Sequence, residues 1–172
     1  MTDYYFDWTG STAGIYLAIL GLLVLPANWL IAATSQTLDD RDLMIFTQVF
    51  ILWGCLAIGQ SSQTYSLAHF VVGSTLMFVG ANCLEGPNLS LLSKTIPSRY
   101  RRGFFNVGLL ATESGTLGRA MGGVILTLAG SQGMGHILNN AFGIMGALSA
   151  SMIALCIVLY NQLYPDEEDE ED

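Results

Sequence analysis

The stretch Leu84–Gly123, LEGPNLSLLSKTIPSRYRRGFFNVGLLATESGTLGRAMGG, decides how the rest of the chain is interpreted. It holds five of the six Lys and Arg residues, and it holds Glu85 and Glu113, the only acidic residues that lie inside apolar runs. Two apolar runs joined by a short basic segment indicate two membrane helices with a loop between them. Because an ionisable residue inside a membrane helix is costly and usually functional, Glu85, Glu113 and Arg119 are the first candidates for a functional site.

The composition is that of a membrane protein with an acidic tail. Hydrophobic residues make up 52% of the chain and charged residues 12%, about half the share in soluble domains. Seven of the fourteen acidic residues lie in 166–172, so the net charge of −8 describes a tail and not a surface. We expect residues 165–172 to be disordered because they are too charged to fold alone. Without a basic face, nucleic-acid binding is not expected.

Residues 1–164 contain five apolar segments, each near the length that crosses a bilayer as a helix. They span about 12–33, 43–59, 66–92, 105–129 and 137–160, and they predict an all-α membrane protein. Pro26 is expected to kink the first span. The third span is long, so it is either tilted or broken at Gly86–Pro87. Tyr4, Tyr5 and Trp8 precede the first span like an interfacial aromatic belt.

Polar side chains recur at helical spacings within these spans. The third span carries Asn82, Glu85 and Asn88 three residues apart, and the first carries Asn28 near its far end. Such a stripe either lines a water-filled cavity or forms ordinary hydrogen bonds between helices. The fourth span carries Glu113, Thr116 and Arg119, which form either a functional row or a structural ion pair to a neighbouring helix. Its small residues Ser114, Gly118 and Gly122 predict a face for close helix packing.

The positive charges predict the orientation. With five spans, Arg41 and the loop residues Lys94, Arg99, Arg101 and Arg102 lie on one side, and the other side has no Lys or Arg. The positive-inside rule makes the basic side cytoplasmic, so the C-terminus is predicted to be cytosolic. The first ten residues lack the basic region of a signal peptide, so we expect a membrane helix upstream and a longer protein.

Nothing in the sequence predicts an enzyme. The three cysteines lie in apolar runs without disulfide or metal spacing, and buried free thiols behave as small hydrophobes. There is no P-loop, dinucleotide or metal-binding motif, so neither a cofactor nor a metal is expected. His69 and His136 have no carboxylate or nucleophile nearby in the sequence.

Four runs resemble the plant-type SPX–major facilitator family of vacuolar phosphate transporters. They are YYFDWTGSTAGIYLAILGLLVLPAN, TLDDRDL, LEGPNLSLLS and SRYRRGFFNVGLLATESGTLGR. The residues that carry the resemblance are, in order, Glu85, Gly86, Asn88, Arg99, Arg102, Gly103, Asn106, Thr112, Glu113, Gly115 and Arg119. Two residues depart from the pattern, Pro87 where a small or branched apolar residue is expected and Val107 where glycine is expected.

The resemblance implies a partial major facilitator fold, with the five spans as helices 8–12 of a twelve-helix transporter. The remaining transporter half and an SPX domain are then the partners of this part, in a vacuolar or other endomembrane. In such folds the substrate lies near the midplane between two halves. Arg119 is the candidate to pair with phosphate or a similar small anion, unless it is permanently bound to Glu85 or Glu113.

Two alternatives stay open at this point. Glu85 and Glu113 are candidate proton relays, because carboxylates that lose hydration exchange protons nearer neutral pH, or else they hold structural salt bridges. The chain itself is either part of a secondary transporter or a non-transporting truncated fragment or membrane assembly module, since alternating access needs two halves that move against each other.

Overall fold

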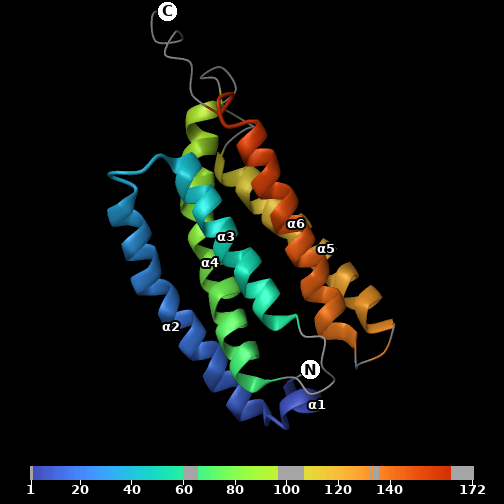
Figure 1. Ribbon diagram of the computed structural model, residues 1–172. Coiled ribbons are helices and arrows are strands. Elements are labelled where there is room, and N and C mark those ends of the chain that lie inside the picture. Colours follow the sequence, from blue (N-terminus) through green and yellow to red (C-terminus); the bar gives the residue numbers. More distant parts are fainter. Residues whose placement is uncertain (1, 60–65, 97–106, 132, 134–135, 164–172) are drawn as a thin grey trace, which may run out of the picture.

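The computed structural model describes residues 2–59, 66–96, 107–131, 133 and 136–163. This part of the chain forms six helices: α1 (Thr2–Phe6), α2 (Gly10–Thr34), α3 (Asp40–Ile58), α4 (Leu67–Thr95), α5 (Val107–Ser131) and α6 (Ile137–Val158). The five long helices run up and down side by side, with α1 beneath one end of the bundle (Figure 1). No strand occurs within the described ranges. The prediction of an all-α protein is confirmed.

Four of the expected spans, α2, α3, α4 and α6, are long and apolar enough to cross a membrane. Helix α5 has 25 residues, which is long enough, but it does not meet the same standard of apolarity. The physical reason is its content of Glu113, Arg119 and six glycines among those residues. A fifth span and a major facilitator arrangement therefore stay predictions.

Prolines do not break the long helices. Helix α4 runs unbroken for 29 residues through Gly86 and Pro87, so the predicted alternative of a break there is wrong. Proline removes one hydrogen bond of the helix ladder, but Pro87 is buried and the turns on both sides of it are held by packing. Helix α2 likewise continues through Pro26.

Helix α3 lies at the centre of the bundle. It packs along α4 on one side and along α6 on the other, whereas α2 contacts mainly α4, and α5 contacts mainly α6. Eight residues of α3 are buried, compared with Leu20 alone in α2. The predicted loop residues Arg99, Arg101 and Arg102 and the tail 165–172 lie outside the described residues.

Glycines set the distance between α3 and α4. A Cβ atom on Gly54 would come within 2.6 Å of the Gly73 carbonyl oxygen, and a Cβ on Gly73 within 2.7 Å of the Gly54 oxygen. Seven residues further along α4, a Cβ atom on Gly80 would lie 3.1 Å from the Thr47 carbonyl oxygen. The two backbones are therefore in direct contact, as small residues permit in membrane helices.

A polar contact joins α3 to α6. The Ser149 hydroxyl donates to the backbone oxygen of Gln48 at 3.0 Å and lies 2.9 Å from its Oε1, and both residues are buried. Cys55, Cys83 and Cys156 are free and buried, as expected for small apolar side chains. The buried polar groups described here are therefore either hydrogen-bonded, as in Ser149 and Gln48, or only weakly polar, as in the three thiols.

We expect Gly73→Ala to destabilise the protein by about 1–3 kcal/mol, the usual cost of forcing a methyl group into a packed interior. Thermal unfolding of the detergent-purified protein measures this effect. Gly21→Ala is the matched control, because a Cβ there meets nothing within 4 Å and alanine favours a helix by about 1 kcal/mol. Equal melting temperatures for the two variants would contradict the close contact.

Candidate functional site

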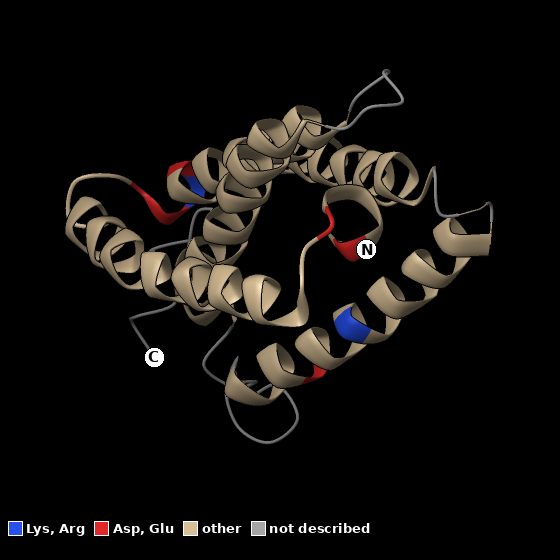
Figure 2. Cartoon of the chain, turned by 90° about the horizontal axis from the view of Figure 1, so that it is seen from below, with Lys and Arg blue, Asp and Glu red and all other residues tan. Residues whose placement is uncertain are grey.

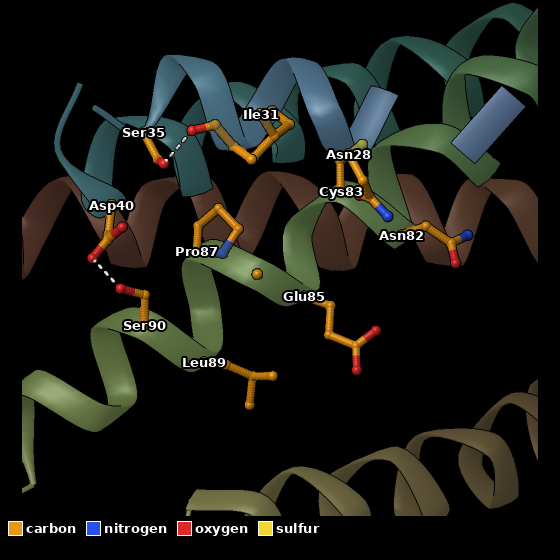
Figure 3. A pocket seen from close by; sticks show the side chains of 12 residues that line it. Asn28, Ile31, Ser35, Asp40, Asn82, Cys83, Glu85, Pro87, Leu89 and Ser90 are labelled. Carbon is orange, nitrogen blue, oxygen red and sulfur yellow. Dashed lines mark hydrogen bonds between the residues drawn. The ribbon is translucent and has the colours of Figure 1, made fainter. Parts of the chain in front are cut away.

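A hollow of about 460 Å³, lined mainly by apolar atoms, lies between the second half of α2, the corresponding part of α4 and the beginning of α3. Three of the predicted site residues line it: Asn28 from α2, and Asn82 and Glu85 from α4. In Figure 3 these three lie toward one end of the hollow, and the hydrogen-bonded pair Asp40 and Ser90 lies at the other. The structure thus brings together residues that are 54 to 57 positions apart in the sequence.

The three predicted residues differ in how they are held. The Asn82 amide donates to the Phe78 carbonyl oxygen at 2.8 Å, so its own helix fixes its orientation. The Asn28 and Glu85 side chains are exposed toward the hollow. Asn88, the third member of the predicted stripe, is exposed but is not among the lining residues. Two of the three residues of the stripe, Asn82 and Glu85, therefore line the hollow.

The charged lining residues that the structure describes, Asp40 and Glu85, are both acidic. Asp40 accepts hydrogen bonds from the Ser90 hydroxyl at 2.7 Å and from the Lys94 ammonium at 2.5 Å. Its charge is therefore compensated within the protein. Within the described ranges no ion pair involves Glu85, so Glu85 sets the sign of the charge in the hollow.

The predicted row on α5 lies apart from the hollow. Glu113, Thr116 and Arg119 are exposed, and none of them lines the hollow. The Arg119 Nε donates to the Gly115 carbonyl oxygen of its own helix at 3.3 Å. In the part of the chain that the structure describes, Arg119 pairs with neither glutamate. Figure 2 shows the charged residues of α5 standing away from those at the α2–α3 junction.

The predicted packing face on α5 is open. Cβ atoms on Gly118 and Gly122 would meet nothing within 4 Å, and the Ser114 side chain is exposed. Close packing against this face stays a prediction, which requires a helix other than those described. Groups of three or more His, Cys, Asp or Glu side chains that could hold a metal ion are not found among the described residues.

Sequence reasoning missed a polar network at the beginning of α3. Besides the contacts of Asp40 with α4, Arg41 donates to the Tyr160 carbonyl oxygen at 2.9 Å, and its guanidinium lies 4.3 Å from the centre of the Tyr160 ring. The Tyr160 hydroxyl donates to Asp42 at 2.7 Å, and this bond raises the pKa of Tyr160. Residues 39–42 thus tie the beginning of α3 to the last turns of α4 and to the segment after α6.

The sequence carried one sign of this network. Four charged residues in succession, Asp39 to Asp42, stand directly before an apolar run. From the sequence alone, Arg41 and Lys94 indicate only the orientation in the membrane. Their partners lie 119 and 54 positions away, so spacing along the chain gave no means to pair them.

We expect Asp40→Ala to destabilise the protein by about 1–3 kcal/mol, because it removes an acceptor whose side chain is only 10% exposed and leaves its donors unpaired. Lys94→Ala should cost less than about 1 kcal/mol, since the Lys94 side chain is 55% exposed and exposed ion pairs contribute little. Thermal unfolding of both variants measures the difference. A larger loss for Lys94→Ala than for Asp40→Ala would refute the role given to Asp40.

Comparison with curated proteins finds named relatives of this sequence. The chain is 41% identical over 165 residues to an SPX domain-containing membrane protein of Oryza sativa, and 40% identical over 166 residues to one of Arabidopsis thaliana. A second Arabidopsis thaliana protein of that description is 37% identical over 166 residues. Each match covers 95% of this chain. No family model matches the chain, and no solved structure matches it significantly.

The chain spans about a quarter of the length of these relatives, 24% in each case. Their description and the four apolar helices support an integral membrane protein with relatives that contain an SPX domain. This confirms the coarser part of the predicted resemblance and localisation.

Proposed function

We propose that the chain is the C-terminal part of a secondary transporter that moves inorganic phosphate or a similar small anion across a vacuolar or other internal membrane. The observation that carries the proposal is the exposed Glu85 carboxylate, which lies on the membrane-length helix α4 and lines the hollow between α2 and α4. A charge at that depth is costly in lipid and marks substrate or proton pathways in many transporters. In the proposed full-length transporter, further helices would supply the polar surroundings that this charge needs.

The exposed polar residues of α4 and α5 support the same proposal. Asn88, Glu113, Thr116 and Arg119 are exposed in this chain, although polar groups in membrane helices face protein or water and not lipid. A further set of helices that covers them would complete a cavity between two halves, which is the arrangement of secondary transporters. The chain on its own is then expected to show no transport, and no catalysis is proposed.

Arg119 is proposed to pair with the anion, because a guanidinium offers a planar, permanently charged fork to phosphate. In proteoliposomes with the full-length protein, we expect Arg119→Ala to lower phosphate uptake by at least tenfold, roughly the loss of one charge-assisted hydrogen bond to the anion. Arg119→Lys should retain part of the uptake because it keeps the charge and loses the fork.

Thr127→Ala is the matched control on the same helix, since the Thr127 side chain is exposed and bonds only to the Gly123 oxygen. Protein levels and thermal stability are measured for each variant. Undiminished uptake by Arg119→Ala at normal protein levels would remove Arg119 from the site. If Arg119→Ala loses phosphate uptake while chloride uptake in the same proteoliposomes is unaffected, the loss is specific to phosphate.

Glu85 and Glu113 are proposed to relay protons or to compensate the charge of the anion. Glutamine keeps the shape of the side chain but cannot titrate, so we expect Glu85→Gln or Glu113→Gln to flatten the pH dependence of phosphate flux. Flux across imposed pH gradients in proteoliposomes measures this, and size-exclusion chromatography checks that folded protein remains abundant.

A structural role for the glutamates predicts another result. The same variants would then lower protein yield or melting temperature and leave the shape of the pH profile unchanged. An unaltered profile in both well-folded variants would end the relay proposal and leave phosphate transport itself untouched.

A further inference from the structure

The hollow between α2 and α4 offers hydrogen-bond acceptors more than donors. The hydroxyls of Ser35 and Ser90 and the amide of Asn82 all line it, and all three donate to oxygen atoms of the protein itself, at 2.7–2.9 Å. The Asn82 Oδ1 and the Glu85 carboxylate remain as acceptors. In Figure 3 the Glu85 side chain projects away from its own helix. The lining therefore suits a group that donates hydrogen bonds.

The charge of the hollow points to the same kind of group. Asp40 is paired with Lys94, whereas no ion pair of Glu85 occurs in the part of the chain that the structure describes. Phosphate needs donors and positive charge around it, and here it would meet a carboxylate and acceptor oxygens. A cation with several N–H donors matches both the charge and the hydrogen bonds.

The exposed residues of the helices indicate which surface meets lipid and which meets protein. All four exposed residues of α3 are large and apolar: Phe46, Phe50, Trp53 and Leu56. The exposed residues in the middle of α4 are small, polar or charged: Ala81, Glu85, Gly86 and Asn88. Polar groups in membrane helices face protein or water, so the exposed side of α3 suits lipid and that of α4 suits a protein surface.

The depth of Glu85 favours a protein side chain over the amine of a lipid headgroup. Helix α4 has 29 residues, which at about 1.5 Å per residue matches the roughly 40–45 Å of a bilayer with its headgroups. Glu85 lies ten residues before the end of α4, or about 15 Å along the helix. Headgroups occupy only about 5–7 Å on each side. A lipid amine would have to leave that layer to reach Glu85, whereas a side chain on a neighbouring helix reaches it sideways.

We infer that the hollow receives an Arg or Lys side chain from a membrane helix of the full-length protein outside this chain, and that this cation pairs with Glu85. The chain spans 24% of the length of its relatives, so such helices belong to the proposed full-length protein. Long cationic side chains bury their aliphatic stems on apolar surface, and Ile31, Pro87 and Leu89 provide such surface in the lining. The inference rests on the proposed function only for its consequence, which is that the cation offsets a charge that repels phosphate.

A charge-swap scan of the full-length protein tests the pair without reference to any substrate. Glu85→Lys sets two cations against each other and should lower the melting temperature of the purified protein. Each Lys and Arg in the membrane-spanning segments outside this chain is then changed to Glu on that background. One of these changes should restore the melting temperature of the parent. Glu85→Gln keeps an acceptor oxygen for the cation and should lower the melting temperature much less than Glu85→Lys does.

Asn88→Lys is the matched control, because Asn88 is exposed on the same helix and does not line the hollow. The change that restores Glu85→Lys should not restore Asn88→Lys, since the new cation there has no contact with the partner. Proximity is checked with cysteines at position 85 and at the identified position, which a short bis-maleimide reagent should join.

The inference would be overturned if no change outside this chain restores Glu85→Lys, or if Arg99→Glu, Arg101→Glu, Arg102→Glu or Arg119→Glu restores it instead. Phosphatidylethanolamine that raises the melting temperature of the parent in nanodiscs, but not that of Glu85→Gln, would also overturn it, because a lipid amine would then occupy the hollow. A restored pair in a protein that moves no phosphate would refute the proposed substrate and support the pair. Phosphate uptake by the parent, with no restoring change, would do the reverse.

Discussion

The direct contact between the backbones of α3 and α4 at Gly54 and Gly73 is the constraint on which the rest of the bundle depends. Lipid gives membrane helices no hydrophobic reason to associate, so close packing and interhelical hydrogen bonds must hold them together. The glycine contact provides the first, and the Ser149–Gln48 bond between α6 and α3 provides the second. Helices α3, α4 and α6 therefore form the fixed part of the bundle, and α2 and α5 are added to it.

This division places Asn28 and Arg119 on the less fixed helices α2 and α5, and Asn82 and Glu85 on the fixed helix α4. The hollow forms where α2 leans on α4, and Arg119 lies on α5, which contacts mainly α6. Elements with few buried contacts are those that move or open first. The polar networks have the opposite role, because Asp40 and Arg41 fasten α3 at one end to the last turn of α4 and to Tyr160.

The sequence predicted the helices well, because the length of an apolar run is a local property. It predicted the site in part. Residues three apart on a helix drift by about 60° at each step, so Asn82 and Glu85 reach the hollow with Asn28, and Asn88 points elsewhere. Neither the glycine contact nor the Asp40 network could be predicted. The position of a glycine in the sequence does not reveal which helix packs against it. The small residues of α5 have the spacing that is typical of close helix packing, yet in this chain the close contact is between Gly54 and Gly73.

The charges of the hollow set a condition on any anion that enters it. Asp40 is neutralised by Lys94, so the remaining charge in the described lining is that of Glu85, which has the sign that repels phosphate. Two changes relieve this repulsion: a proton on Glu85, or a cation brought from outside the hollow. Of the three cations on the described helices, Arg41 and Lys94 are engaged at the beginning of α3, and Arg119 lies on α5, which makes few contacts with α4. Phosphate binding, protonation of Glu85 and the position of α5 are therefore coupled by simple electrostatics if the proposed function holds, whichever of the three changes first.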